Sequence, residues 1–150
     1  SLDLNDLVRR ALDQINMDSH DSIAIHLKLA TGLAPVRANR LQVEKVLVNI
    51  IKNGIEAMHD AAAGKRSISL MIRTSVEGSM ARAAVCDSGA GIATDTLHRI
   101  FDPFFTTKPD GLGMGLAISR TIIESHGGRL WAESVQDAGA CFNFTLPFAA

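Results

Sequence analysis

The chain has 150 residues, of which 47% are hydrophobic and 21% charged, and its formal net charge is −1. This composition predicts a single folded domain over residues 1–150 and excludes a disordered chain. A balanced charge argues against a general nucleic-acid-binding protein, and no apolar run reaches the roughly 18 residues of a membrane span. We therefore expect a cytoplasmic domain that contacts neither nucleic acid nor membrane, cut from a longer parent whose membrane status is open.

The hydrophobic pattern predicts helices mixed with strands along the chain. Apolar residues at helical spacing predict helices over residues 4–15, 41–63, 93–100 and 114–126. Alternating apolar residues predict strands over residues 23–29, 67–74, 81–87, 128–134 and 140–148. Local signals are a hairpin turn at Glu77 and Gly78, a helix cap at Thr94, and a helix stop at Gly127 and Gly128. The mixture predicts an α/β (α+β) two-layer sandwich, with helices on one face of a mixed, mostly antiparallel sheet.

Two cysteines, Cys86 and Cys141, are too few for a disulfide framework and lack the spacing of metal ligands. We expect both to be reduced residues of the core.

The helical segment over residues 42–58, QVEKVLVNIIKNGIEAM, carries asparagines at positions i and i+4. At about 100° per residue its apolar side chains form one stripe, and Lys45, Asn49, Asn53 and Glu56 lie on the opposite face. A solvated polar face accounts for this pattern in most helices. Asparagine is nevertheless a poor helix former, and its amide oxygen suits Mg²⁺ alongside water and phosphate oxygens. A ligand site on this face is the alternative interpretation.

The segment AVCDSGAGI, residues 84–92, places Asp87 at the end of an apolar strand, followed by Gly89 and Gly91. A tight turn capped by the aspartate explains this pattern. The functional alternative is a carboxylate that accepts a hydrogen bond from a purine amino group, with Gly91 letting a flat ring approach the backbone.

The segment FDPFFTTKPDGLGMGL, residues 101–116, places three phenylalanines before a run of alternate glycines. We expect Phe101, Phe104 and Phe105 to pin this loop to the core, because exposing three aromatic rings is costly. The functional alternative adds a lid, in which Lys108 meets a phosphate. The glycines and the start of the next helix then supply free N–H groups.

A dinucleotide-binding fingerprint is the rival interpretation of these glycines, with Glu133 as its acidic residue. It requires a preceding strand, whereas Pro103 and Pro109 precede Gly111. Leu116 also stands where the last glycine should be, so we reject it.

Taken in order, these segments resemble the N, G1, F and G2 boxes of the GHKL ATPase and kinase superfamily. The resemblance is closest to the catalytic ATP-binding domains of two-component sensor histidine kinases, and it covers residues 2–148. The run FDPFFTTKPDGLGMGLAISRTIIESHGG is its most specific part and is similar to the nitrogen-regulation and nitrogen-fixation sensor kinases. The resemblance implies the Bergerat α/β sandwich, with ATP and Mg²⁺ as ligands.

Residue by residue, the resemblance implies that Asn53 holds Mg²⁺ and that Asn49 and Lys108 join it in catalysis near the phosphates. Asp87 would accept the adenine amino group, and Thr145 would join a water network around adenine. The implied nucleotide-binding set is Asn49, Lys52, Asn53, Asp87, Gly89, Gly91, Ile92, Phe101, Thr107, Lys108, Gly111, Leu112, Gly113, Met114, Gly115, Leu116 and Thr145. Two departures are Gly54, where the family often has alanine, and Ala57, where some members have an aromatic residue over adenine.

The resemblance also implies which reaction is expected. ATP-hydrolysing relatives such as gyrase B carry a glutamate where this chain has Asn49, and an amide cannot take a proton from water. The implied reaction is transfer of the γ-phosphate of ATP to a histidine on a separate dimerisation domain of the same protein. ADP is then the product, and a response regulator is an indirect partner. Two alternatives stay open: a serine kinase of the anti-sigma-factor type, and a non-enzymatic nucleotide-binding module.

Overall fold

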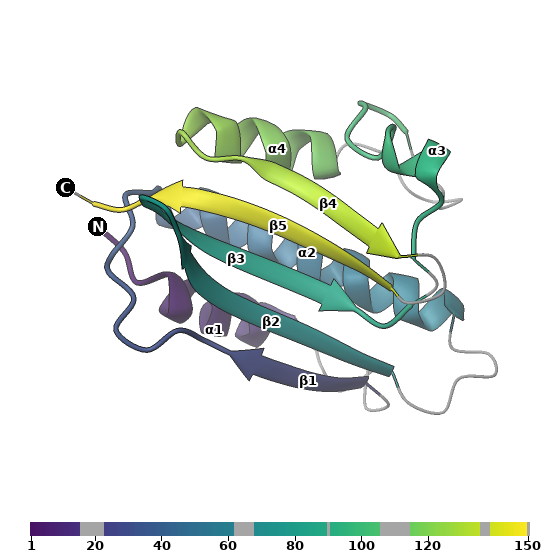
Figure 1. The fold of residues 1–150 in the computed structure, drawn as a ribbon, viewed down its shortest axis with the longest axis horizontal. Helices are drawn as coiled ribbons and strands as arrows, with labels where there is room; N and C mark the ends of the chain where they lie inside the picture. Colours follow the sequence, from purple (N-terminus) through teal and green to yellow (C-terminus); the bar gives the residue numbers. More distant parts are fainter. Residues whose placement is uncertain (16–22, 62–67, 90, 106–114, 136–138, 150) are drawn as a thin grey trace.

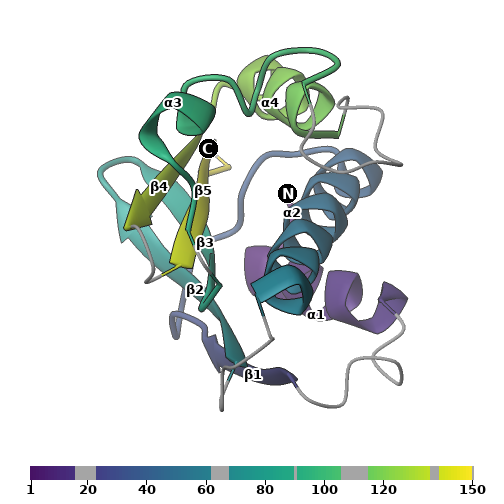
Figure 2. The same ribbon diagram turned by 90° about the vertical axis from the view of Figure 1, so that its right-hand side faces the viewer.

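The computed structural model describes residues 1–15, 23–61, 68–89, 91–105, 115–135 and 139–149. It forms a two-layer sandwich, in which the long helices cover one face of a single sheet (Figures 1 and 2). The helices are α1 (Leu4–Gln14), α2 (Arg40–Ala61), α3 (Thr94–Leu97) and α4 (Gly115–Ser125). The strands are β1 (Ile23–Lys28), β2 (Ile68–Glu77), β3 (Met80–Asp87), β4 (Leu130–Val135) and β5 (Gly139–Pro147). The predicted fold class and the main elements are confirmed.

The sheet has five strands in the order β1-β2-β3-β5-β4. Only β1 and β2 pair in parallel, and the other three pairs are antiparallel. Strand β5 therefore returns between β3 and β4. This return places the start of β5 beside the end of β3, where Cys86 pairs with Cys141.

The core lies between the sheet and α1, α2 and α4, and α2 contributes most to it. The apolar stripe expected on α2 is buried, including Leu47, Ile50, Ile51 and Met58. Every second residue of β5 faces this core, and Phe144 and Leu146 are fully buried there. The intervening β5 residues, Cys141 among them, lie on the open face of the sheet.

Local capping fixes where α2 and α4 begin and end. The Asn39 side chain accepts a hydrogen bond from the Gln42 amide at 3.1 Å, which caps α2. At the end of α4, the Gly128 amide bonds the Ile123 carbonyl and the Gly127 amide bonds the Glu124 carbonyl. With Gly127 at φ +83°, this is a Schellman motif, and the predicted glycine stop is confirmed.

One local prediction is wrong, and a second, the hairpin turn, is confirmed with a shift of one residue. Thr94 is the first residue of α3, and its N-cap is Ala93, which makes no side-chain cap bond. The hairpin between β2 and β3 turns at Gly78 and Ser79, because β2 continues through Glu77. Gly78 takes φ +60°, the left-handed conformation that a tight hairpin needs.

The prediction for the cysteines is also wrong. Cys86 and Cys141 form a disulfide with a Cα–Cα distance of 4.0 Å, and both are half-buried on the open face rather than in the core. The antiparallel register sets the two residues directly opposite each other, so their Cβ atoms are already within bonding reach. A count of cysteines carries no information on this register.

Gly128 gives a test of the packing between α4 and β5. A Cβ atom at this position would overlap the carbonyl oxygen of Thr145 on β5. We expect Gly128→Ala to lower the free energy of unfolding by about 4 kcal/mol, because a paired strand backbone cannot move aside. Gly32→Ala is the control, since no atom lies within 4 Å of its Cβ position and only backbone strain at φ +71° remains. We expect that variant to lose about 1 kcal/mol. Urea denaturation measures both, and equal losses would contradict the assigned packing.

Candidate functional site

Helix α2 is the shared wall of the candidate site. On one side its second half packs against the end of β3, and on another side it runs beside α4 (Figures 1 and 2). Asn49 contacts α4, whereas Gly54 and Ala57 contact the segment around Asp87. At 1.5 Å per residue, the two contact regions are about 8 to 12 Å apart along the helix.

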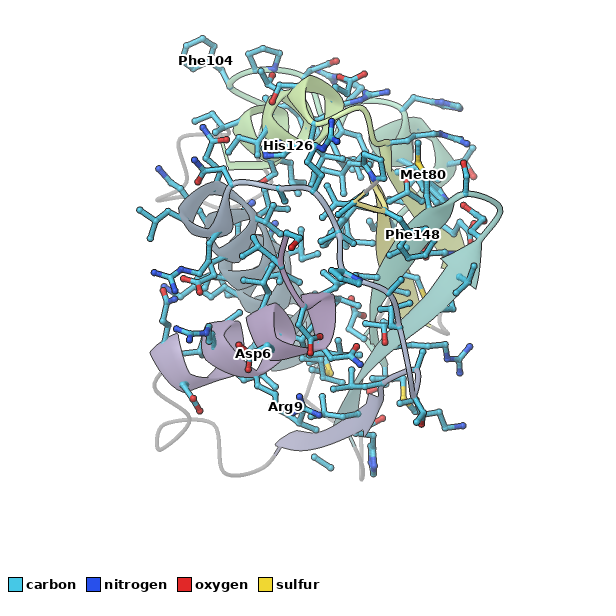
Figure 3. All side chains as sticks on the ribbon, turned by 90° about the vertical axis from the view of Figure 1, so that its left-hand side faces the viewer. Asp6, Arg9, Met80, Phe104, His126 and Phe148 are labelled. Carbon is cyan, nitrogen blue, oxygen red and sulfur yellow. A yellow bond between two sulfur atoms is a disulfide. The ribbon has the colours of Figure 1, made fainter. Side chains whose placement is uncertain are left out.

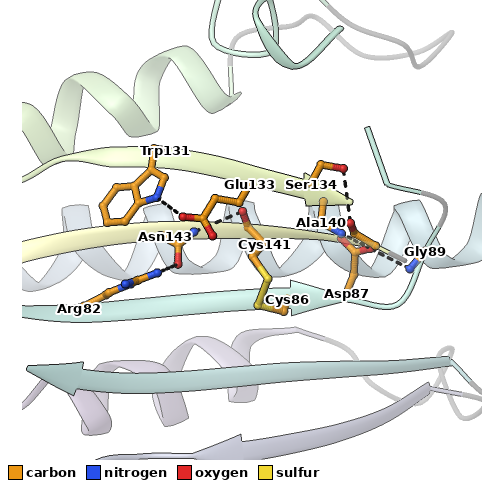
Figure 4. Close-up of a disulfide and its surroundings, with 11 residues drawn as sticks. Arg82, Cys86, Asp87, Gly89, Trp131, Glu133, Ser134, Ala140, Cys141 and Asn143 are labelled. Atoms are coloured by element: carbon orange, nitrogen blue, oxygen red, sulfur yellow. Dashed lines mark hydrogen bonds between the residues drawn. A yellow bond between two sulfur atoms is a disulfide. The ribbon is translucent and has the colours of Figure 1, made fainter. Parts of the chain in front are cut away.

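Asp87 is the buried carboxylate at the end of β3, with 8% of its surface exposed. Its Oδ1 atom accepts hydrogen bonds from the Gly89 amide at 2.9 Å and from the Ala140 amide at 3.4 Å (Figure 4). The Oδ2 atom lies toward α2, 4.0 Å from where a Cβ of Gly54 would be. The backbone of β5 and of the following turn thus holds the carboxylate in one orientation.

Glycines let the backbone pass close to this carboxylate. A Cβ at Gly89 would lie 3.0 Å from Asp87 Oδ1 and 3.2 Å from the Ala57 carbonyl oxygen. A Cβ at Gly54 would lie 2.9 Å from the Cδ1 atom of Leu70, the movable end of a side chain. The absence of a side chain is therefore a stricter requirement at Gly89 than at Gly54.

The turn after Asp87 is tied to two neighbouring strands. The Ser88 hydroxyl accepts a hydrogen bond from the Ser69 amide of β2 at 2.8 Å. The Ile92 amide donates to the Ser134 hydroxyl of β4 at 2.6 Å. Gly91 between them takes φ +80°, which favours glycine. These bonds hold the turn beside the Asp87 carboxylate.

The other end of the site is where α2 meets the first turn of α4. The Asn49 side-chain amide donates to the Ser119 hydroxyl at 3.2 Å, and Ser119 is 3% exposed. A Cβ at Gly115 would lie 2.6 Å from Asn49 Oδ1, so the amide oxygen is directed at the first residue of α4. A helix N-terminus carries a partial positive charge and unpaired N–H groups, both suited to an anion.

A hollow of about 220 Å³ lies along this junction. The described residues that line it are Lys45, Val48, Asn49, Lys52, Gly115, Ile118, Ser119 and Ile122. Two lysines from α2 therefore border the same space as the start of α4, which adds positive charge to that end of the site.

Comparison with known proteins identifies the family. The family model described as "Histidine kinase-, DNA gyrase B-, and HSP90-like ATPase" matches residues 38–150. The chain belongs to this ATPase family. The matched region contains α2, Asp87 and α4, which are the three parts of the site.

The relatives of this ATPase domain are sensor kinases. The sensor protein FixL of Bradyrhizobium diazoefficiens is 43% identical over 128 residues, which cover 85% of this chain and 25% of FixL. The chain thus spans about a quarter of that relative. In the described part of the chain, none of the helices combines the length and apolar character needed to cross a membrane.

Solved histidine kinases share the fold. The nucleotide-free catalytic domain of ThkA superposes with a TM-score of 0.84 at 30% identity, covering 99% of this chain and 97% of that one. ThkA in complex with the response regulator protein TrrA gives a TM-score of 0.80 at 29% identity, covering 99% and 41%. Full-length ShkA in complex with AMPPNP gives 0.82 at 27% identity, covering 99% and 31%.

The structure brings together many of the residues predicted for the site. Asn49, Lys52 and Gly115 border the hollow, and Asp87 and Gly89 contact each other. Asn53 is half-buried, one turn after Asn49 on α2, and Leu116 packs against the core behind the first turn of α4. The predicted residues Thr107, Lys108, Gly111, Leu112, Gly113 and Met114 lie outside the described residues.

The phenylalanines behave as expected in two cases out of three. Phe101 packs edge-on against Phe142 with ring centroids 6.5 Å apart, and the Arg120 guanidinium lies over the Phe101 ring, 4.9 Å from its centroid. Phe105 is half-buried beneath Arg99. Phe104 is 75% exposed and stands away from the ribbon in Figure 3. The prediction that Phe104 pins the loop to the core is wrong; its backbone takes φ +67°, a conformation rare for residues other than glycine, and its side chain is exposed.

Thr145 lies away from Asp87, on the opposite face of the sheet. It lies opposite Arg82, five residues from Asp87 along β3. Alternation puts it on the face of the sheet away from α2, and its hydroxyl accepts a hydrogen bond from the Arg129 amide at 3.1 Å. Asp87 faces the other side of the sheet, toward α2.

Sequence reasoning missed Ser119 and Ala140. Ser119 lies one helical turn after Gly115, so helical spacing could have identified it as a second contact of α4 with α2. Ala140 contacts Asp87 through its backbone amide, and only the pairing of β3 with β5 reveals that contact.

Substitution of Asp87 tests the hydrogen bonds that its carboxylate accepts from the backbone. We expect Asp87→Ala to lower the free energy of unfolding by about 2 kcal/mol, because it removes the acceptor of the Gly89 and Ala140 amides. Asp87→Asn keeps one acceptor oxygen and should lose less than about 1 kcal/mol. Chemical denaturation distinguishes the two variants, and an unaltered stability of Asp87→Ala would show that these amides do not depend on the carboxylate.

Proposed function

We propose that this domain binds ATP with Mg²⁺ and donates the γ-phosphate to a histidine on a separate dimerisation domain. The observation that carries the proposal is the placement of Asp87 and Gly115 at two points along α2 about 8 to 12 Å apart. That separation fits a ligand with a base at one end and phosphates at the other. Family membership and the AMPPNP complex of ShkA support the same ligand.

Asp87 is assigned to the adenine end. Its Oδ1 atom is already held by two backbone amides, and Oδ2 lies on the α2 side. A carboxylate oxygen accepts a hydrogen bond from the amino group of adenine, whereas guanine would present a carbonyl oxygen there. Gly89, Gly91 and Ile92 form the turn beside the base. Ala57 leaves the base without an aromatic cover from α2.

The phosphates are assigned to the junction of α2 and α4. The first turn of α4 offers N–H groups, Lys52 offers positive charge, and Asn49 lies directly against Gly115. The lid residues Thr107 and Lys108, with Gly111, Leu112, Gly113 and Met114, are assigned to the same end from the family motif alone. Phe101 anchors the segment that leads into that lid.

Mg²⁺ is assigned to Asn53. The donor chemistry fits, since an amide oxygen is a hard ligand and Mg²⁺ usually takes few protein ligands beside substrate phosphates and water. When bound, the metal would neutralise charge on the phosphate oxygens during transfer. Asn53 would position it from α2, one turn from Asn49 toward the adenine end.

The acceptor is assigned to another domain. Asn49 stands where a base would activate water, and an amide cannot do so. His126 is occupied within the fold, because its Nε2 accepts from the Asn39 amide at 3.0 Å and its Nδ1 bonds the Ile122 carbonyl at 2.7 Å. A histidine on a dimerisation domain of the parent protein supplies the nucleophile, and the phosphate passes to a response regulator. We place this chemistry in the cytoplasm.

The nucleotide assignment is tested by titration calorimetry with ADP and GDP. We expect Asp87→Asn to weaken ADP binding by about 100-fold or more, because the amide oxygen stays with the two backbone N–H groups and the NH₂ group then faces the adenine amino group. Asp95→Asn, an exposed carboxylate on α3, is the control and should bind ADP normally. Comparable affinity of the wild-type chain for ADP and GDP would contradict the assignment of Asp87 to the adenine amino group.

The reaction is tested with labelled ATP and a dimerisation domain from a related sensor kinase. We expect acid-labile label on the added domain only, since tethering and alignment of the nucleophile supply much of the rate. Asn53→Ala should reduce transfer by about 100-fold while metal-free ADP binding changes little. Thr121→Ala, on the exposed side of α4, is the control. Label on the isolated chain, or equal loss of metal-free binding, would refute the scheme.

A further inference from the structure

The disulfide lies immediately beside the proposed adenine site. Cys86 directly precedes Asp87 on β3, and Cys141 directly follows Ala140 on β5 (Figure 4). Ala140 is the residue whose amide donates to Asp87 Oδ1 at 3.4 Å. The covalent cross-link and the hydrogen bond therefore join the same two strand ends, one residue apart and on opposite faces of the sheet.

The contact between these strand ends is close. A Cβ at Gly139 would overlap the backbone carbonyl of Asp87, so the start of β5 lies directly against the end of β3. The Ala140 side of this contact faces the nucleotide site, and the cysteine side faces away from the helices. A change in the spacing of the two strands at the cysteines would move the Ala140 amide relative to the Asp87 carboxylate.

The two sulfur atoms are on the side of the sheet that no described helix covers. Both cysteines are half-buried there, between Met71 of β2 and Glu133 of β4. A small dithiol can approach from this side without entering the nucleotide site. Disulfides in ATP-using, reducing compartments are mostly transient or redox-sensing rather than structural.

We propose that Cys86 and Cys141 form a redox couple that sets the affinity of the neighbouring nucleotide site. A dithiol reductant attacks one sulfur, the Cys86–Cys141 bond breaks, and a second exchange releases the reductant as a disulfide. The chain gains two electrons and two protons as two thiols. The oxidised form holds Asp87 and Ala140 in register and binds adenine nucleotide more tightly, because less order has to be gained on binding. This inference rests on the proposed function.

The coupling has to be reciprocal. If oxidation tightens ADP binding by some factor, bound ADP favours the disulfide over the dithiol by the same factor. We expect a factor of about five, at the lower end of typical couplings between sites.

The test compares ADP affinity of the oxidised chain and of the chain reduced with dithiothreitol, with thiol labelling to verify each state. We expect reduction to weaken ADP binding about fivefold, and saturating ADP to shift the equilibrium with dithiothreitol by the same factor. The double variant Cys86→Ser with Cys141→Ser is the control, and its affinity should not respond to dithiothreitol. Equal ADP affinities of the two verified forms would overturn the inference. Failure of the wild-type chain to form the disulfide at any ratio of oxidised to reduced dithiothreitol would overturn it as well.

A second readout separates this inference from the proposed function. Hydrogen exchange at the Ala140 and Gly89 amides, measured without nucleotide, should be faster in the reduced chain, because both amides bond the Asp87 carboxylate. If neither form binds ADP, the proposed function fails, and the inferred redox control of nucleotide binding is overturned with it. If ADP binds and exchange at both amides is unaltered by reduction, nucleotide binding stands and the inference alone fails.

Discussion

The packing of α2 against the end of β3 is the constraint on which the rest of the structure depends. One face of α2 makes a large contribution to the core with residues such as Leu47, Ile50 and Ile51, and Gly54 on the same helix lies against Asp87. A larger residue at position 54 would push against the Leu70 side chain on β2. The helix that stabilises the sandwich therefore also sets the distance between the buried carboxylate and α4. The contact between α2 and β3 therefore contributes both to the stability of the fold and to the geometry of the site.

The site uses backbone groups more than charged side chains. The Gly89 and Ala140 amides orient Asp87, and the start of α4 presents N–H groups next to Asn49. Backbone donors in regular strands and helices cost little entropy to hold in place, since the fold has already ordered them. Glycine at positions 89 and 115 keeps the backbone close enough for this use. Such a rigid frame suits the proposed function, in which this domain positions ATP and a histidine of another domain supplies the nucleophile.

The two faces of the sheet carry different parts of the chemistry. Asp87, Ala140 and Phe142 face α2 and the core, while Cys86, Cys141 and Thr145 face away. Neighbouring residues of a strand point to opposite faces. A change at Cys86 or Cys141 on the open face is therefore only one residue away, along the chain, from Asp87 or Ala140 on the face of the proposed nucleotide site. The disulfide therefore affects the Asp87 environment through the backbone of β3 and β5, without occupying the space that a nucleotide would take.

Hydrophobic periodicity and glycine stops are local signals, so the main helices, the strands and the polar face of α2 could be predicted from the order of residues alone. Asp87, Asn49 and Gly115 were candidate site residues from their local patterns. In the structure Asn49 is on α2, and Asp87 and Gly115 contact α2 from β3 and α4. The bond between Cys86 and Cys141, the contact of Ala140 with Asp87, and the position of Thr145 on the open face of the sheet could not be predicted in this way. These depend on the order and register of β3 and β5, which join segments more than fifty residues apart. Strand register at that distance is fixed by the packing of the whole sheet against α2, and no local pattern of residues contains it.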